Sequence, residues 1–322
     1  MVNDDSTTRN GWEPFLIPTD DNIAWQVEDV EEEMFLLYSQ LQGSFNEHLD
    51  DKDDDDASME SGLGSVNPRE GQITITLPVC RCQTCSLRFS QKGSKKSQPQ
   101  RFIPSSKDII LFQDTTALNS RKGDTGSVLW RASKKFARLI LSEMLISHAN
   151  LSTCQILEFG AGTGLLAMAL GPLVKRYMAT DLPPLIPLID KNVAHNFPVV
   201  PPSILSETLD WTDFQSLSSN ARLKAYKDVW IQDFPDSGPR IILVVDCVYN
   251  PSLIPPLLSV INHFASPETD EKKALVLVII ELRAEEVTRL FLSHWIDSGK
   301  WEIWSLRVLD ARFAVWLGRL TS

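Results

Sequence analysis

The sequence has no long hydrophobic run and few cysteines, and each shortage excludes a class of protein. No stretch of about eighteen apolar residues occurs among its 322 residues, so we expect no membrane-spanning helix. Five cysteines in a chain this long, without a secretory context, indicate reduced thiols, and residues 1–20 lack the basic and apolar parts of a secretory signal. We therefore expect a cytoplasmic protein, with the nucleus as a second location.

The sequence also has little that indicates a metal site or a hydrolase. Cys80, Cys82 and Cys85 lie close together, but no second pair follows, and the five histidines are scattered. Structural zinc normally takes four ligands in paired spacings, so we expect no metal. No Ser-His-Asp or paired-carboxylate arrangement can be picked out by spacing, and no internal repeat is visible.

Negative charge is concentrated at the N-terminus. Residues 1–60 contain 18 Asp or Glu against only Arg9 and Lys52, which gives them a net charge of −16. Because the whole chain has a net charge of −11, the remaining residues carry +5. Such a segment could attract basic protein partners, or it could simply be a solvated segment. Residues 81–131 hold ten Lys or Arg, which could contact RNA phosphate, fold against the acidic segment, or form a solvated loop.

The pattern divides the chain into three parts. Residues 1–25 are expected to be a disordered acidic tail. Residues 26–125 form an N-terminal extension with a helix over 27–41, an acidic linker over 46–64, a strand over 71–79, a basic loop over 81–107 and a short strand over 109–113. Residues 126–322 form the main domain, which begins with a helix over 133–148.

From Cys154 onward, strands and helices alternate. Strands are expected over 155–159, 176–180, 204–209, 240–245 and 275–280, and helices over 165–174, 185–195, 252–264 and 284–297. This alternation predicts an α/β fold with a mainly parallel sheet covered on both faces. The runs 302–307 and 313–318 predict a terminal antiparallel hairpin at the sheet edge, which completes the outline of a Rossmann-like seven-stranded methyltransferase sheet.

The segment from Ile156 to Leu165 carries the strongest motif. A short apolar run ends at Glu158, and the turn Gly160-Ala161-Gly162-Thr163-Gly164 leads into a helical segment. Glycines let the backbone approach a ligand closely, and the helix start supplies free N–H groups. The pattern is G-x-G-x-G and lacks the last glycine of the dinucleotide motif, which favours S-adenosylmethionine over a dinucleotide. A plain strand–turn–helix corner is the alternative.

Acidic residues follow several of the predicted strands, where open α/β sheets bind ligands. Glu158 could orient the glycine loop or accept from the methionine amine through water, or it could cap loop N–H groups. Asp181, 17 residues after Gly164, is placed to accept both ribose hydroxyls, although it could also be a helix-start residue.

Asp210 and Trp211 follow the third strand and suit adenine, with the carboxylate accepting from the N6 amine and the indole packing on the ring. Trp130, upstream, could close the other side of the cofactor. Either tryptophan could instead belong to the core.

The fourth strand ends in Val245-Asp246-Cys247-Val248-Tyr249. A carboxylate and a phenol near one point could bind and position an incoming lysine amine. Placement in line with the sulfonium methyl supplies most of the acceleration of a methyl transfer. Asp246 could instead be a helix cap, and Cys247 is interpreted as a small wall residue. Asn250-Pro251 follows the tyrosine, so its order differs from the Asn-Pro-Pro-Tyr motif of amide and adenine methyltransferases.

Together these residues resemble the family 16 protein lysine methyltransferases of the seven-strand class, and within it the fungal ribosomal lysine methyltransferase 5 group. The similarity extends from about Gly71 to the C-terminus. The segments that carry it are 126–130, 157–164, 180–181, 209–211, 246–249, 282–287 and 312–313. Phe159 stands where Leu is commoner in the family, and the acidic N-terminal segment has no counterpart that we can map.

The resemblance implies an S-adenosylmethionine-dependent enzyme that methylates a lysine of another protein. It implies that Trp130, Gly160, Ala161, Gly162, Asp181, Trp211 and Val245 line the cofactor pocket, and that Asp246 and Tyr249 face the lysine. A basic ribosomal protein is the expected target, and an elongation factor or a chaperone is the alternative. A non-catalytic binding partner with this fold is a further alternative. We expect a monomer without membrane contact that meets nucleic acid only indirectly.

Overall fold

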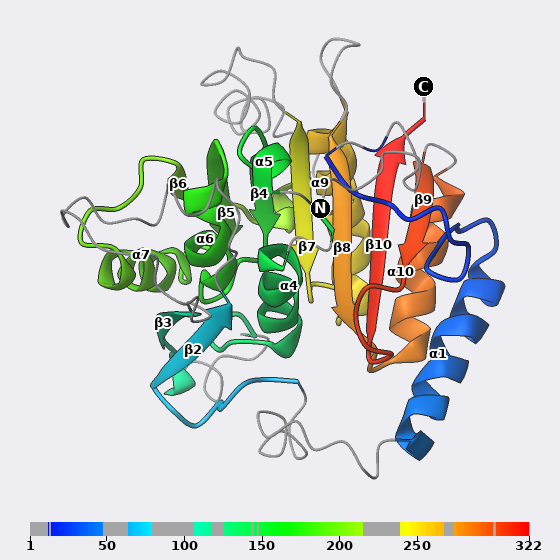
Figure 1. Cartoon of the computed structure of the whole chain (residues 1–322), viewed down its shortest axis with the longest axis horizontal. Coiled ribbons are helices and arrows are strands. Elements are labelled where there is room, and N and C mark those ends of the chain that lie inside the picture. Colours follow the sequence, from blue (N-terminus) through cyan, green and yellow to red (C-terminus); the bar gives the residue numbers. More distant parts are fainter. Residues whose placement is uncertain are drawn as a thin grey trace, which may run out of the picture.

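One mixed sheet with the strand order β1-β9-β10-β8-β7-β4-β5-β6 runs through the centre of the protein (Figure 1). The computed structural model describes residues 12, 14–47, 64–78, 106–116, 125–142, 145–146, 148–214, 239–266, 274–298 and 301–321. The parallel strands are β4 (Gln155–Phe159), β5 (Arg176–Asp181), β6 (Ile204–Thr208), β7 (Arg240–Val245) and β8 (Leu275–Glu281). The predicted hairpin, β9 (Trp301–Leu306) and β10 (Phe313–Leu320), continues the sheet in antiparallel pairing. The predicted fold class is thereby confirmed.

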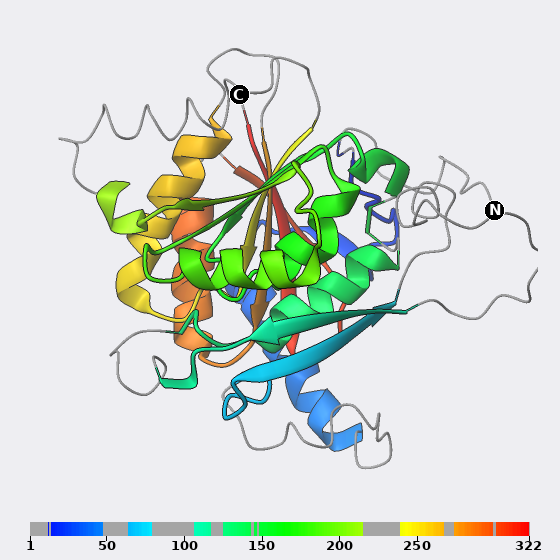
Figure 2. The same cartoon turned by 90° about the vertical axis from the view of Figure 1, so that its left-hand side faces the viewer.

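Helices cover both faces of this sheet, as Figure 2 shows edge-on. α4 (Arg131–Leu141), α6 (Leu165–Leu170) and α7 (Ile186–Asn196) lie on one face, and α1 (Val30–Glu47), α9 (Ile254–Ala265) and α10 (Glu285–Asp297) lie on the other. The short α5 (His148–Leu151) precedes β4. β8 is buried at every position because both of its faces meet helices, which explains why its sequence is continuously apolar up to the final Glu281.

Four of the parallel strands deliver their following loops to one edge of the sheet. β4 pairs with both β5 and β7, and β6 pairs with β5, all in parallel register. The carboxyl ends of parallel strands meet at the same edge. The glycine turn after β4, the last residue of β5 and the turns after β6 and β7 are therefore neighbours.

Residue 12 and residues 14–25 have a defined structure, so the predicted disorder is wrong for them, while residues 1–11 and 13 lie outside the described part of the chain. Trp12, Phe15 and Ile17 are buried, and the ring of Trp12 meets Trp304 edge-on at 6.3 Å. β1 (Ala24–Gln26) pairs with β9 and adds an eighth strand to the seven that were predicted. Burial of these apolar side chains offsets the cost of ordering an otherwise polar segment.

α1 confirms the predicted helix and extends it to Glu47, into the segment predicted as the start of the acidic linker. The helix packs against the sheet with the carboxylate of Glu33 at the contact, where this residue is only 1% exposed. Glu33 accepts hydrogen bonds from Ser305 Oγ at 2.7 Å, Trp316 Nε1 at 3.0 Å and Trp25 Nε1 at 3.0 Å. A buried carboxylate is tolerated only when hydrogen bonds satisfy it, and here they join the helix to the sheet.

A second sheet, formed by β2 (Gln72–Pro78) and β3 (Ser106–Phe112) in antiparallel pairing, packs outside α4 and α7. Its apolar side chains belong to the same hydrophobic core as α4 and α6, so the predicted boundary at residue 125 does not coincide with a break in the core. Asn192 and Asn196 of α7 bond the outer backbone of β3 at Phe112 and Ile110. These two amides satisfy backbone groups of β3 that a third strand would otherwise bond.

Cys80, Cys82 and Cys85, most of the predicted basic loop and most of the predicted acidic linker lie outside the described residues. Within the described part of the chain, no three His, Cys, Asp or Glu side chains gather in a way that could bind a metal ion. No helix in that same part has the length and apolar character needed to cross a bilayer.

Candidate functional site

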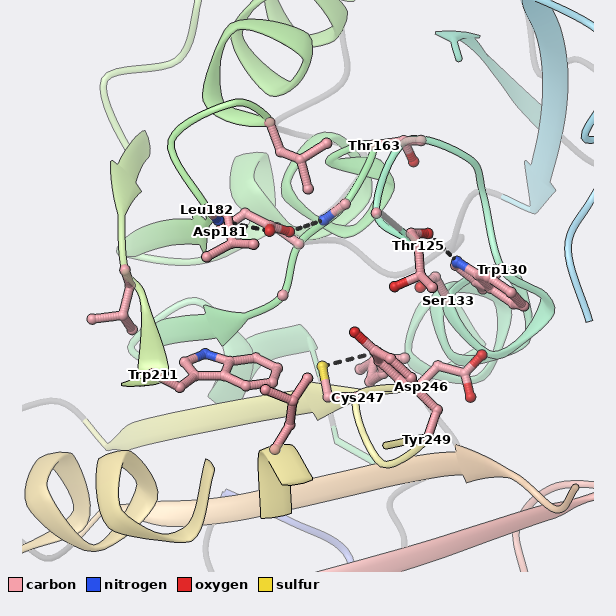
Figure 3. A pocket seen from close by; sticks show the side chains of 18 of the residues that line it. Thr125, Trp130, Ser133, Thr163, Asp181, Leu182, Trp211, Asp246, Cys247 and Tyr249 are labelled. Carbon is pink, nitrogen blue, oxygen red and sulfur yellow. Dashed lines mark hydrogen bonds between the residues drawn. The ribbon is translucent and has the colours of Figure 1, made fainter. Parts of the chain in front are cut away.

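A cavity of about 390 Å³ opens where the loops after β4, β5, β6 and β7 meet. This size is within the roughly 300–1,000 Å³ that is usual for small-molecule sites. Asp181 and Trp211 lie toward one end of the cavity, and Trp130, Asp246 and Tyr249 lie toward the other (Figure 3). The predicted strand-end residues therefore converge on one space.

The glycine turn forms the floor of this cavity. Gly160 and Gly162 have positive φ angles of 67° and 56°, a conformation that side chains disfavour. A Cβ at Gly160 would lie 2.8 Å from Cys247 Sγ, and one at Gly162 would lie 3.1 Å from the carbonyl oxygen of Gly126. Both positions thus require glycine for conformation and for space. Gly160, Ala161 and Gly162 line the cavity, as predicted.

Asp181 connects the end of β5 to the glycine turn. Its Oδ2 accepts the Gly162 N–H at 2.7 Å and its Oδ1 accepts the Leu182 N–H at 2.7 Å. The side chain lines the cavity although the residue is only 8% exposed. A carboxylate has about four lone-pair sites, so accepting two backbone N–H groups leaves acceptor capacity for a ligand.

Asp210 and Trp211 line the cavity next to β6, as the sequence predicted. Asp210 Oδ1 accepts the backbone N–H of Thr212 at 2.9 Å and its hydroxyl at 2.7 Å, which begins the short 3₁₀ helix Trp211–Phe214. The indole of Trp211 lies against the glycine turn, within 3.4 Å of where a Cβ of Gly160 would stand. An aromatic face is thereby fixed above the cavity floor.

Asp246 stands directly after β7 with a φ of 59°, which is rare for a residue other than glycine. Its carboxylate receives two parallel hydrogen bonds from Arg283, with Nη1 to Oδ1 at 2.8 Å and Nη2 to Oδ2 at 2.7 Å. The Asp246 side chain is 4% exposed but lines the cavity. The site therefore presents a carboxylate whose charge is already paired.

Arg283 belongs to a chain of alternating charges that continues away from the cavity. Its Nη2 also donates to Glu281 Oε2 at 2.8 Å, and Glu281 Oε1 meets Arg131 Nη2 at 2.5 Å. Burial raises the pKa of Glu281, while the charges of Arg283 and Arg131 act in the opposite direction. Burial opposes the charge of Arg283, but its bonds to Asp246 and Glu281 outweigh this and raise the pKa of Arg283.

Tyr249, predicted to face the lysine, and Trp130 and Val245, predicted to line the cofactor pocket, all line the cavity. Tyr249 is 39% exposed, so its ring lies at the mouth. Trp130 donates its indole N–H to the carbonyl of Thr125 at 2.6 Å, which fixes the ring. The guanidinium of Arg283 lies over that ring, with its Cζ 5.1 Å from the ring centroid.

Cys247 lines the cavity between Trp211 and Asp246 (Figure 3). Its thiol donates to the carbonyl of Phe159 at 3.2 Å. Burial raises the pKa of Cys247 well above the usual range, and the charges of Asp181, Asp246 and Glu158 raise it further. The nucleophilic thiolate is disfavoured, in agreement with its interpretation as a wall residue.

Two residues predicted to bind cofactor do not line the cavity. Gly164 begins α6, and a Cβ there would lie 3.1 Å from Ile189, so it faces α7. Glu158 is 2% exposed and accepts the hydroxyl of Tyr177 at 2.8 Å beneath the glycine turn. Its side chain points into the core because β4 is buried on both faces. The prediction that Gly164 and Glu158 contact the cofactor is therefore corrected: Gly164 packs against α7, and Glu158 bonds Tyr177 in the core.

The burial of Glu158 gives a prediction about pH. Burial raises its pKa from 4.5 to about 8; the Tyr177 hydrogen bond opposes this, and the charge of Asp181 adds to it. Between these pH values the folded protein holds a proton that the unfolded chain has lost, so the free energy of unfolding falls as pH rises. We expect Glu158→Gln, which can still accept from Tyr177, to gain about 3 kcal/mol over wild type between pH 5.5 and 8.5. Urea unfolding of both proteins at the two pH values measures this. Equal pH dependence of the two proteins would contradict the prediction.

Asn192 is a positioning residue that the sequence did not reveal. Its side chain is fully buried, and its Nδ2 donates to the carbonyl of Thr163 in the glycine turn at 2.9 Å and to that of Phe112 at 3.1 Å. Its Oδ1 accepts the Phe112 N–H at 2.8 Å. The amide thus joins β3 of the extension to the turn that forms the cavity floor. The signal in the sequence is Asn192 and Asn196, four residues apart on one helix face.

Asn196 provides a matched control, because it bonds Ile110 of β3 in the same way but does not bond the glycine turn. We expect Asn192→Ala to weaken S-adenosylmethionine binding about tenfold, since the turn loses a buried hydrogen bond. Asn196→Ala should change that affinity less than about threefold at a similar loss of stability. Titration calorimetry and thermal unfolding of both variants measure these quantities. Equal affinities in the two variants would show that the amide only supports the fold.

The sequence missed several residues that line the cavity. Thr125, Ser133, Thr163, Leu182, Leu185 and Leu253 come from loops and helix ends whose placement depends on the three-dimensional packing. Thr163 had a usable signal, because it lies inside the glycine turn.

A profile of the family described as lysine methyltransferase matches residues 110–294, which is more than half of the chain. A protein of Zygosaccharomyces rouxii named ribosomal lysine N-methyltransferase 5 is 25% identical over 301 residues, covering 79% of this chain and 89% of that protein. The diaminohydroxyphosphoribosylamino-pyrimidine deaminase of Schizosaccharomyces pombe is 28% identical over 207 residues, covering 64% of this chain but 46% of that protein. Among solved structures, an O-methyltransferase family protein from Burkholderia thailandensis has a TM-score of 0.39 at 13% identity, covering 60% of this chain and 57% of that one.

Proposed function

This chain belongs to the lysine methyltransferase family, and on that premise we propose that the lysine it methylates lies in a ribosomal protein. The enzyme uses S-adenosylmethionine, which supplies an electrophilic methyl group on a sulfonium when it is bound. The observation that supports methyl transfer to an amine is the shared cavity, in which Asp181 and Trp211 lie toward one end and Asp246 and Tyr249 toward the other.

The residues at the first end fit an adenosyl group. Gly160 and Gly162 leave room that a Cβ would fill, and Asp181 keeps acceptor capacity for ribose hydroxyls. Trp211 offers an aromatic face for adenine, and Asp210 offers an acceptor for its amine. We assign these four roles to the residues of this chain as part of the proposal.

The residues at the second end fit an alkyl amine. Trp130 and Tyr249 offer ring faces to the lysine side chain, and Asp246 accepts a hydrogen bond from its nitrogen. Because Tyr249 lies at the mouth, the amine passes it before reaching Asp246. Holding the nitrogen in line with the methyl group is the main catalytic task of these residues.

Two observations support a ribosomal target over other proteins. The relative from Zygosaccharomyces rouxii, named as a ribosomal lysine methyltransferase, aligns with this chain over 89% of its length. Residues 1–60 of this chain carry a charge of −16, which is complementary to the basic surface of ribosomal proteins. The proposal includes a monomeric enzyme in the cytoplasm, where Cys154 and Cys247, both free, would stay reduced.

The deaminase name of the second relative is not transferred to this chain. Only 46% of that protein is matched. Zinc-dependent nucleobase deaminases carry an H-x-E motif, and none of His48, His148, His195, His263 and His294 is followed by Glu at the second position. We therefore do not propose deamination for this chain.

Ribosomes from cells that lack this gene test the proposal. Purified protein and tritiated S-adenosylmethionine are added to those ribosomes, to wild-type ribosomes and to ribosome-free lysate, and the labelled lysine is located by mass spectrometry. We expect label in a ribosomal protein of the first sample and little in the second, whose site is already methylated. Label confined to the lysate would identify an elongation factor, chaperone or other protein as the target. Cofactor binding without label in any sample would favour the non-catalytic alternative.

A further inference from the structure

The guanidinium of Arg283 is bonded to the carboxylate of Asp246. Two bonds of 2.8 and 2.7 Å hold the carboxylate in a fork, and the Glu281 N–H lies 3.3 Å from Oδ1. A lysine ammonium that enters the cavity therefore meets a neutral ion pair and not a bare anion.

The surroundings hold Arg283 in place. Its second carboxylate partner, Glu281, is 5% exposed in the side chain and is shared with Arg131. Trp130 covers one face of the guanidinium region, and the backbone of Gly64 packs so closely that a Cβ there would lie 2.3 Å from Nη2. A guanidinium with two carboxylates and two packing partners cannot swing away without breaking several contacts. Arg283 therefore stays beside Asp246 when substrate enters.

The charges around Arg283 cancel. The ionisable groups that face it are Asp246 after β7, Glu281 at the end of β8 and Arg131 at the start of α4, which together with Arg283 sum to zero. Cys247 and Tyr249, beside Asp246 on the cavity wall, are uncharged at neutral pH. Asp181 and Asp210 are the other charged side chains among the residues that line the cavity.

Lysine must lose a proton before its nitrogen can attack. Its ordinary pKa is about 10.4, so about one molecule in a few thousand is neutral at pH 7. An unpaired carboxylate nearby would stabilise the ammonium and make the neutral amine rarer still. A carboxylate paired with a guanidinium accepts a hydrogen bond from the amine without this penalty.

We propose that Arg283 is a positioning residue for the acceptor amine: it orients Asp246 and cancels its charge, so that the site binds lysine as a neutral amine. This inference rests on the proposed lysine methylation. The ammonium gives its proton to bulk water on entry. The nitrogen lone pair then forms the new N–C bond, the S–C bond breaks with its electron pair moving to sulfur, and the product leaves as a methylated ammonium. Atoms and charge balance without any further reactant.

Binding of a lysine analogue tests Arg283 without any knowledge of the protein target. N-acetyl-lysine amide is titrated by NMR into the protein saturated with S-adenosylhomocysteine, at pH 7.0 and pH 9.5 (pH values chosen for the assay, about 3 and 1 units below the ordinary lysine pKa). In wild type we expect affinity to rise about tenfold or more with pH, because the neutral form is preferred. In Arg283→Gln we expect affinity to stay level or fall with pH, because Asp246 is unpaired and prefers the ammonium.

Arg283→Lys separates charge from shape. Lysine keeps the positive charge but cannot make the two-pronged contact. We expect it to retain the wild-type pH dependence of binding while its transfer rate falls about tenfold, since Asp246 is less well oriented. The same variant also provides a test should Arg283→Gln fail to fold, which thermal unfolding and S-adenosylhomocysteine affinity would reveal.

Arg312 offers a matched control, because it makes a similar two-pronged contact with Asp310 outside the cavity. Arg312→Gln should leave the pH dependence of analogue binding unchanged. If Arg283→Gln keeps the wild-type pH dependence and loses only stability, Arg283 is a structural residue and the proposal is wrong. A failure of ribosome labelling would overturn the ribosomal target but leave this test intact, because the analogue replaces the target.

Discussion

Replacing Asp246 with asparagine is expected to lower the rate of methyl transfer by about 100-fold or more, while the affinity for S-adenosylmethionine changes less than about threefold. Asp246 lines the cavity at the end opposite Asp181, so its loss affects the amine and not the adenosyl group. Asparagine keeps the shape but removes the negative charge that balances Arg283. The amine then loses the charged acceptor that holds its nitrogen in line with the methyl group. Single-turnover transfer of tritium and calorimetry with the cofactor measure the two quantities.

Asparagine is the informative substitution at this position because of the backbone. The φ of 59° at Asp246 is a conformation that asparagine and aspartate adopt far more readily than alanine. Alanine would add a backbone cost of about 1–2 kcal/mol to the loss of the carboxylate. A reduced rate in the alanine variant would therefore mix local unfolding with lost chemistry.

Asp310→Asn is the matched control, since Asp310 also makes a two-pronged contact with an arginine but lies outside the cavity. It should lose some stability and keep nearly full transfer. Equal rates in wild type and Asp246→Asn, with the cofactor bound, would remove Asp246 from the reaction and leave Tyr249 as the remaining candidate at that end.

The sheet and the glycine turn could be predicted because local sequence determines them. β4, β7 and β8 are short runs of mostly apolar residues, and a helix follows each of them. Asp181, Asp210 and Asp246 could be predicted as neighbours because the ends of parallel strands share one edge. Knowledge of which strands are adjacent was not needed for that step.

The partner of Asp246 could not be predicted from local sequence. Arg283 is 37 residues away, and only the pairing of β7 with β8 brings the two together. The same limit applies to Glu158: β4 is buried on both faces, so alternation along the strand does not tell which side chains point to the cavity. The carboxyl group of Glu158 was therefore predicted to contact the cofactor, whereas in the structure it accepts a hydrogen bond from Tyr177.

The N-terminal segment illustrates a third limit. Trp12 and the short run Phe15-Leu16-Ile17 lie in a polar, acidic stretch and are too few to show the period of a strand or helix. Trp12 packs against Trp304 of β9 and Arg319 of β10, and Phe15 forms a backbone bridge with Ile146, which are long-range contacts that composition cannot reveal. Glu33 looks like any other acid on the solvent face of a helix, yet three side-chain donors from distant segments bury it.

Replacing Asp181 with asparagine is expected to weaken S-adenosylmethionine binding about 30- to 100-fold. Asp181 accepts the Gly162 N–H through one oxygen and the Leu182 N–H through the other, so it fixes the turn that forms the cavity floor. An asparagine side chain has one acceptor oxygen and would turn an N–H donor toward the second backbone N–H. One buried backbone donor is then unsatisfied, and one of the acceptors assigned to the ribose is lost, at about 2–3 kcal/mol together.

Asp190→Asn separates this effect from the general effect of removing an acidic side chain. Asp190 lies on the exposed side of α7, bonds Ser206, and does not line the cavity. Its variant should bind the cofactor within about twofold of wild type. Calorimetry with S-adenosylmethionine and with S-adenosylhomocysteine should give the same ratio for Asp181→Asn, because both ligands carry the ribose and differ only at sulfur. A loss confined to S-adenosylmethionine would instead place Asp181 near the sulfonium charge, and the adenosyl and amine ends assigned to the cavity would have to be exchanged.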